Sequence, residues 1–470
     1  MIRFYSRWFV GALLGWLVWS GWPSQSHAGS PLKLSWTVGP KQHRTKLYLR
    51  FSGFIRPEVQ TNRGDYAFKS EDSDVYVASR IRVTGGVIYR KSVGIHVTLQ
   101  DARFWGNALP SGGKIRFNTN TSEYFTRDMY YGLQLFESYL YLRWDEAQVD
   151  LKAGRIKVTY GDSFFIGDPG FIPTGQSFDG MLLSWKRNGF KLDLMWLMVR
   201  ESVATDQIEG CEGKCFWEGD TLAGAYATKQ FGKSNSVDLY GYYYQRAPRN
   251  ASLKEQTQIA YLGVRYVLNH RIVHLSLEGN LQVGRHLDRN LLAGAGIVAA
   301  KIKIPVKTKP YFKVQGLFAT GDGDPTDEAE NNFLALFNKR RRFYGLINLY
   351  GLSNIIQPMV EFGLQPHKQL KLAVNFRYNL KMNAKGTMVA AGSHNPSLAD
   401  LTGEDGLELG SEIDLSIKYA PFPGVQFHLG GGIFLPAKEL HQRGVDGTIT
   451  KTFGLDPAFM LFLNFKISLG

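Results

Sequence analysis

Lysine and arginine side chains recur at alternate positions along several stretches of this 470-residue chain, so each set lies on one face of an extended strand. Such rows attract anions rather than make or break bonds, because fixed charges between low-dielectric walls focus their field. We single out as candidate pore residues Lys46, Arg50, Arg56, Arg80, Arg82, Lys152, Arg155, Lys191, Lys313 and Arg377, with the carboxylates Glu412 and Asp414.

Two interpretations of these charges stay open. Rings of basic residues in a pore select anions, whereas charges that pair across neighbouring strands simply fill the interior. Arg155 is a special case, because strict alternation turns it outward unless a bulge at Gly154 re-aims it. The same polar faces carry five further lysines and five further carboxylates, so that cations predominate once the first set is included: Lys301, Lys303, Lys371, Lys418 and Lys466, with Asp150, Asp193, Glu278, Glu361 and Glu408.

No pattern for catalysis is present. The ten histidines are scattered, and the chain has no GxSxG nucleophile elbow, no phosphate-binding glycine loop and no paired metal-ligand motif. We therefore predict that the protein is not an enzyme and has no cofactor. A calcium ion held by Asp322 and Asp324 is an alternative to a flexible polar loop. The basic run from Asn338 to Arg342 suits either anionic ligands or a solvated loop.

Amphipathic stretches of about ten residues position these side chains. Between Lys46 and Pro57, Leu47, Leu49 and Phe51 alternate with basic and polar residues. One strand of this kind also suits a soluble sandwich, but a sustained series with one polar and one apolar face is typical of a transmembrane β-barrel. The pattern recurs at 75–83, 92–100, 371–381 and 407–418.

Connection lengths separate a membrane barrel from a soluble one. Turn-sized connections lie at 144–147, 187–189, 232–235, 268–270, 366–368 and 421–423. Long polar connections lie between them, at 58–74, 102–131, 161–176, 201–219, 321–354, 382–406 and 436–455. We predict that short and long alternate strictly, as periplasmic turns and outer loops do in outer-membrane barrels, with about eighteen strands and both ends of the barrel chain on the periplasmic side.

Composition agrees with this fold class, an all-β transmembrane antiparallel barrel. The mean hydropathy is −0.20 and the formal net charge is +14, while aromatic residues make up 13% and there are 51 glycines. Beyond the first residues no apolar run approaches the roughly twenty residues that a membrane helix needs. Aromatic residues near strand ends, such as Trp185 and Tyr243, suit the interface girdles of a barrel as well as ordinary packing.

The first 28 residues are predicted to be a signal peptide, and residues 29–470 a single barrel domain. Arg3 and Arg7 precede an apolar stretch, and Ser26-His27-Ala28 resembles a small-residue cleavage site. Export favours a disulfide between Cys211 and Cys215 in a predicted outer loop, and a metal site there is the weaker alternative because no histidine is near.

Several segments resemble the alginate export family of outer-membrane barrels. They are QDARFWG, GRIKVTYGDSFFIG with QSFDG, TGDGDP, and LGSEIDL with GGGIFLP, in matching order from Gln100 to Pro436. The resemblance implies a monomeric barrel with an electropositive channel for an anionic polysaccharide, partly constricted by loops. The chain departs from the family pattern at Gln176, where an arginine is expected, and at Gly470, which replaces a terminal aromatic residue.

Taken together, these features predict a passive, anion-conducting channel in the outer membrane of a Gram-negative type cell. A general or small-anion porin for nutrient uptake, and a barrel that anchors an adhesin or scaffold, are the alternatives. The expected surroundings are membrane lipid and lipopolysaccharide, an anionic solute or polysaccharide, and periplasmic export partners, without nucleic acid.

Overall fold

A computed structural model describes residues 34–38, 44–61, 73–105, 132–168, 170–200, 220–246, 257–324, 326–389 and 396–469. The predicted signal peptide, most of the loop at 102–131, the loop at 201–219 and the Cys211–Cys215 pair lie outside the described residues. The described residues hold one short helix, α3 (Arg340–Phe343), and no helix of membrane-spanning length and apolarity.

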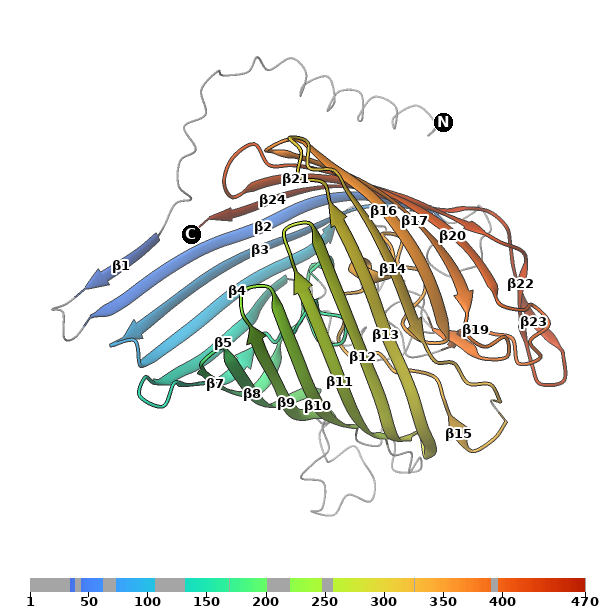
Figure 1. Cartoon of the computed structure of the whole chain (residues 1–470), viewed down its shortest axis with the longest axis horizontal. Helices are drawn as coiled ribbons and strands as arrows, with labels where there is room; N and C mark the ends of the chain where they lie inside the picture. The colour runs from blue at the N-terminus through green and yellow to red at the C-terminus, as the bar shows by residue number, and fades with distance from the viewer. Residues whose placement is uncertain are drawn as a thin grey trace.

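Eighteen antiparallel strands close into a barrel, as predicted. Each strand pairs with the next, and β24 lies beside β2 (Figure 1). In this closing pair Leu469 lies opposite Phe51. The strands are β2 (Thr45–Thr61), β3 (Ser73–Tyr89), β4 (Val93–Trp105), β5 (Gly132–Trp144), β6 (Val149–Ile156), β7 (Phe178–Arg187), β8 (Phe190–Arg200), β9 (Asp220–Phe231), β10 (Asn235–Arg246), β11 (Thr257–Asn269), β12 (Val273–His286), β13 (Arg289–Lys303), β14 (Tyr311–Ala319), β16 (Ile355–His367), β17 (Leu370–Lys381), β20 (Glu408–Tyr419), β21 (Val425–Pro436) and β24 (Ala458–Leu469).

The described residues form six further short strands beside those of the barrel. β1 (Leu34–Val38) pairs with the first residues of β2, and β15 (Ala329–Glu330) pairs with β13. Two hairpins, β18 (Thr387–Val389) with β19 (Pro396–Ala399) and β22 (Leu440–Arg443) with β23 (Ile449–Phe453), belong to the connections β17–β20 and β21–β24. A hydrogen bond from Leu401 N–H to the Arg443 carbonyl joins these two connections at 3.3 Å.

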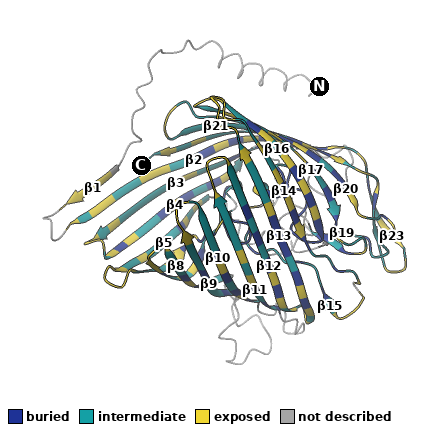
Figure 2. Cartoon of the chain, in the orientation of Figure 1, coloured by how far each residue is buried: buried dark blue, intermediate teal, exposed yellow. Residues whose placement is uncertain are grey.

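Burial alternates along the strands (Figure 2). On β16 and β14 the inward Gln357, Met359 and Leu317 are buried, whereas the outward Val360 and Phe318 are exposed. Exposed apolar side chains would be unfavourable in water but are suited to lipid. The alternation therefore places one face of each strand toward the membrane and the other toward the lumen.

The connections follow the predicted sorting with one exception. Turns such as 145–148, 188–189 and 232–234 join strands at one end, which we call the short-turn end and which faces the periplasm in barrels of this kind. β2 begins and β24 ends there. At the opposite end, β12 and β13 are joined by Leu287 and Asp288 alone, both with positive φ. The prediction of strict alternation is wrong at this hairpin.

Candidate functional site: the barrel lumen

Two long connections fold into the lumen. Inner loop A comprises residues 157–177 and inner loop B residues 320–354, both described except for one position each. Neither loop is simply solvated, because its apolar side chains are buried: Phe164, Ile166, Phe333 and Ile347 are at most 2% exposed. Burying each such side chain contributes about 1.5–3 kcal/mol, which favours loops held inside the barrel over loops extended into water.

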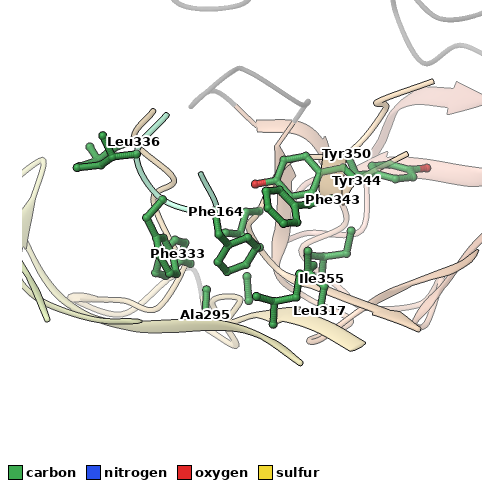
Figure 3. Packing of buried hydrophobic residues seen from close by; sticks show 14 of the residues in the cluster. Phe164, Ala295, Leu317, Phe333, Leu336, Phe343, Tyr344, Tyr350 and Ile355 are labelled. Atoms are coloured by element: carbon green, nitrogen blue, oxygen red, sulfur yellow. The ribbon is translucent and has the colours of Figure 1, made fainter. Parts of the chain in front are cut away.

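The aromatic residues of both loops pack on each other and on the barrel wall (Figure 3). The Phe164 ring lies 5.0 Å from that of Phe343, and the Phe165 ring 5.7 Å from that of Phe333. Ala295 of β13 and Leu317 of β14 line the wall beneath Phe164. The two inner loops therefore share one apolar core with the strands β13 and β14.

Backbone hydrogen bonds also join the loops to each other. Ile166 and Phe337 form a parallel bridge, in which Gly167 N–H donates to the Phe337 carbonyl at 2.6 Å and Phe337 N–H donates to the Phe165 carbonyl at 3.2 Å. Lys339 N–H donates to the Ser163 carbonyl at 2.9 Å. Because these bonds link the two loops directly, we expect the loops to move as one unit.

Three predicted pore arginines hold inner loop A in place. Arg56 donates to the Phe171 carbonyl at 2.8 Å and stacks on the Phe171 ring, and its side chain is 2% exposed. Arg80 donates to the Pro173 carbonyl at 3.4 Å, and Arg82 lies 4.0 Å from the Asp168 carboxylate. These arginines lie on the lumen face of their strands, where they contact groups of the loop and the wall.

Arg377, Glu412 and Asp414 hold inner loop B. The Arg377 guanidinium donates to the Phe343 carbonyl at 3.0 Å and to Asp414 at 2.9 Å. The two carboxylates accept backbone N–H bonds from the loop, Asp414 from Leu346 and Glu412 from Ile347. All three side chains are buried, so the structure gives them the alternative role considered from the sequence, charge pairing inside the lumen.

Asp162 of inner loop A connects both loops to the wall. Its carboxylate accepts from Arg265 of β11 at 2.7 Å and from Arg342 of inner loop B at 2.6 Å. Burial favours a higher pKa, but hydrogen bonding and charge from Arg265, together with Arg342, bring the pKa of Asp162 below its ordinary value of 3.8. The group is therefore ionised at neutral pH and binds both arginines.

Because its pKa is lowered in the folded chain, Asp162 stabilises the loops above pH 3.8, and the effect is lost as the pH falls through the lowered pKa. Asp162 therefore stays ionised between about pH 5 and about pH 7, and we expect the inner loops to constrict the channel equally at both pH values. Asp162→Asn should raise conductance noise at both pH values. A wild type that becomes noisy on going from pH 7 to pH 5, beside an Asp162→Asn variant that stays quiet, would contradict this assignment.

The predicted lysines occupy a different place. Lys152, Lys191, Lys301, Lys303, Lys313, Lys371, Lys418 and Lys466 each lie within four residues of the short-turn end of their strand and face the lumen; we call this set the lysine rim. Lys46 and Arg50 lie on the same inward face of β2, also toward that end. The rim therefore surrounds the periplasmic mouth rather than the level of the inner loops.

Few carboxylates neutralise the lysine rim. Lys191 pairs with Asp193 at 2.5 Å. Within the described part of the chain, the other rim lysines make no ion pair: Lys152, Lys301, Lys303, Lys313, Lys371, Lys418 and Lys466. Lys301 lies directly opposite Lys313 across β13 and β14, and Lys371 directly opposite Lys418 across β17 and β20. Like charges in facing positions destabilise a sheet, so the rim has an electrostatic cost.

Arg155 is wrongly placed by the sequence prediction. It alternates with the inward, buried Ile156 and points outward, where it pairs with Asp179 of β7 at 2.7 Å. Gly154 has a φ of 129°, but the alternation continues through it and no bulge turns Arg155 inward. Arg155 is thus a residue of the outer face, 43% exposed in its side chain.

We expect Arg155→Ala to leave conductance and ion selectivity unchanged and to change stability by no more than about 1 kcal/mol. Reversal potentials and urea unfolding in detergent measure the two quantities. A change in ion selectivity would contradict the placement of Arg155 on the outer face and would indicate that it lines the lumen.

Residues of the two remaining loop motifs, the acidic segment at Asp322 and the basic run from Asn338 to Arg342, make contacts inside the protein. Arg289 lies among the acidic residues near the proposed calcium site, 3.2 Å from Asp322 and 3.0 Å from Glu330, so a guanidinium already supplies positive charge there. Among the described residues no group of three metal-binding side chains is present. In the basic run, Arg341 stacks on Phe171 and Arg342 binds Asp162, so these residues fasten the loops rather than form a solvated outer segment.

Sequence reasoning missed Asp162 and Arg265. The segment GDSFFIG resembles a family motif, but nothing in the sequence pairs its aspartate with an arginine about a hundred positions away. The apolar run Phe164-Phe165-Ile166 inside a polar connection is the signal that indicates a loop buried in the lumen.

Comparisons with known proteins give one family match and a set of similar folds. The family model described as alginate export matches residues 48–449. Among solved structures, Pseudomonas aeruginosa OccK11 (OpdR) has a TM-score of 0.51 at 11% identity, covering 91% of this chain and 96% of that chain. The outer membrane protein OprD from Pseudomonas aeruginosa gives 0.50 at 12% identity (90% and 94%), and Acinetobacter baumannii OccAB4 gives 0.52 at 10% (90% and 98%). These likenesses show the fold alone, and no curated protein matches the chain.

Proposed function

The chain belongs to the alginate export family of outer-membrane barrels, and on that premise we propose that it is a passive channel for an anionic solute of the polysaccharide class. The lysine rim attracts the solute at the periplasmic mouth, and the joined inner loops constrict the path beyond it. No energy-coupling motif is needed, because the solute follows its own gradient.

The facing lysine pairs carry this proposal. Lys301 opposite Lys313 and Lys371 opposite Lys418 are costly arrangements when no anion is present. Glu361 lies directly opposite Lys313 across β14 and β16 and offsets part of the repulsion, but among the described residues its carboxylate makes no ion pair with a rim lysine and accepts from the Tyr311 hydroxyl at 2.8 Å. An anionic chain that bridges the ammonium groups would relieve the repulsion.

Arginines and lysines have different positions in the lumen, and this difference supports the same function. Arginine has a planar fork of donors that holds a fixed partner, and here Arg56, Arg265 and Arg377 hold loop groups. Lysine is a strongly hydrated point charge on a flexible stem, which gives weaker and more transient contacts. A permeating anion must bind weakly enough to leave, so a rim of lysines suits conduction.

The test is electrophysiological. The refolded barrel in planar bilayers should show an anion-selective reversal potential and a current that uronate oligosaccharides reduce. Anion selectivity without this block would favour a porin for small anions. An open barrel without anion preference would overturn the proposal, and a barrel without conductance would favour an anchoring or adhesive role.

A further inference from the structure

A tyrosine beside the lysine rim lies across a glycine on the lumen wall. Tyr48 of β2 faces Gly86 of β3, which in turn faces His96 of β4. A Cβ at Gly86 would lie 2.4 Å from the Tyr48 Cζ, so glycine is required for the tyrosine to lie there. The Tyr48 hydroxyl reaches past Gly86 and hydrogen-bonds His96 Nδ1 at 2.6 Å. The ring is therefore held along the wall and spans from β2 toward β4.

Cationic and polar groups surround this ring. The Arg50 guanidinium lies 5.3 Å from the Tyr48 ring centroid. On the other side, His96 stacks on Tyr139 of β5 at 4.6 Å, and Lys152 of the lysine rim lies 5.0 Å from the Tyr139 ring. Tyr48 itself is partly exposed. The Glu137 carboxylate lies 3.9 Å from His96 Nε2. The wall at this point therefore offers an aromatic surface with Arg50 on one side, Lys152 on the other and one carboxylate beside His96.

A second tyrosine provides a contrast. Tyr311 of β14 lies across Gly363 of β16 in the same manner, where an added Cβ would be 2.3 Å from the ring. Its ring is already covered, because Lys301 Nζ lies 3.2 Å from the ring centroid. The Arg50 guanidinium lies farther from the Tyr48 ring, at 5.3 Å from its centroid, so Tyr48 is the better placed of the two to receive a ligand.

We propose that Tyr48, with Arg50 and His96, is a binding station for the sugar ring of an acidic saccharide. The C–H groups on one face of a pyranose carry partial positive charge and suit the negative face of an aromatic ring. The carboxylate of the same sugar pairs with Arg50, and a hydroxyl of the sugar hydrogen-bonds near His96. This inference rests on the proposed function, and it adds recognition of the sugar ring to attraction of its charge.

The alternative is that Tyr48 only covers Gly86, as aromatic residues do beside glycines in sheets. A ligand comparison separates the two roles, because a covering residue does not distinguish cyclic from acyclic anions. The test measures block of the current by trigalacturonate and by citrate, an acyclic anion with the same number of carboxylates. The variants are Tyr48→Leu, Tyr48→Phe and, as a matched control on the outward face, Tyr243→Leu, whose native side chain is 45% exposed.

We expect Tyr48→Leu to raise the half-blocking concentration of trigalacturonate about tenfold and to leave that of citrate unchanged. Tyr48→Phe should keep most of the block because it keeps the ring, and Tyr243→Leu should match the wild type. Equal effects on both anions, or no effect of Tyr48→Leu, would overturn the station.

The outcomes also separate this inference from the proposed function. An anion-selective wild type that trigalacturonate does not block overturns the station and leaves an anion channel. A wild type without anion selectivity overturns the proposed channel. If the barrel does not conduct, calorimetric titration of the detergent-solubilised protein with the same two anions decides the station: trigalacturonate binding that Tyr48→Leu weakens supports it, and equal binding by both proteins overturns it.

Discussion

Replacing the four facing lysines by glutamine, in the variant Lys301→Gln, Lys313→Gln, Lys371→Gln and Lys418→Gln, should remove most of the channel's preference for anions. The expected anion-to-cation permeability ratio falls to near unity, because the rim loses its two pairs of facing positive charges while the barrel keeps its strands. Reversal potentials across a salt gradient measure the ratio. The effect should be largest at low ionic strength, since salt screens charges beyond about 10 Å at 0.1 M.

A matched control changes the same number of lysines in the short turns. Lys233, Lys307, Lys309 and Lys368 lie outside the strands, where their side chains are exposed to solvent. Their replacement by glutamine should reduce selectivity much less. Equal losses in the two variants would mean that overall charge, and not the lysine rim, sets the selectivity.

Arg377→Met should release inner loop B and increase single-channel conductance severalfold. The substitution removes the donor to the Phe343 carbonyl and leaves Asp414 buried at 1% side-chain exposure without its ion-pair partner. Removing one partner from a buried pair costs about 3–5 kcal/mol. Because hydrogen bonds link the inner loops, inner loop A should loosen as well.

Two measurements distinguish loop release from general unfolding. Heat-modifiable electrophoretic mobility reports whether the barrel stays closed, and conductance reports the constriction. A closed barrel with unchanged conductance would show that inner loop B does not limit the current. Arg155→Ala serves as the control, since this arginine lies on the outer face.

The barrel itself was predictable from the sequence. Strands in a closed membrane sheet must satisfy their backbone groups from strand to strand and present one apolar face to lipid, so every strand repeats the same two-residue pattern. The series from Lys46 onward shows this pattern, and the predicted strand number agrees with the structure. The β12–β13 hairpin was not predicted, because its two-residue connection lies at the end of the barrel where long connections are expected.

Alternation also gave the side on which most candidate residues lie, but not their partners. Arg56, Arg82 and Lys313 face the lumen as their positions require. Arg56 and Arg82 contact inner loop A, whereas Lys313 belongs to the lysine rim. Nothing in the local pattern distinguishes these cases, because each is a basic residue at an inward position.

The sequence by itself thus determined the fold class and which residues face inward, because both follow from a period of two along each strand. The tertiary structure alone decided which charged groups form ion pairs. Asp162 pairs with Arg265, and Arg377 with Asp414, only after the strands have paired and the loops have folded inside. It also decided that lysines face each other in pairs at one mouth, because strand register sets which residues lie opposite across neighbouring strands.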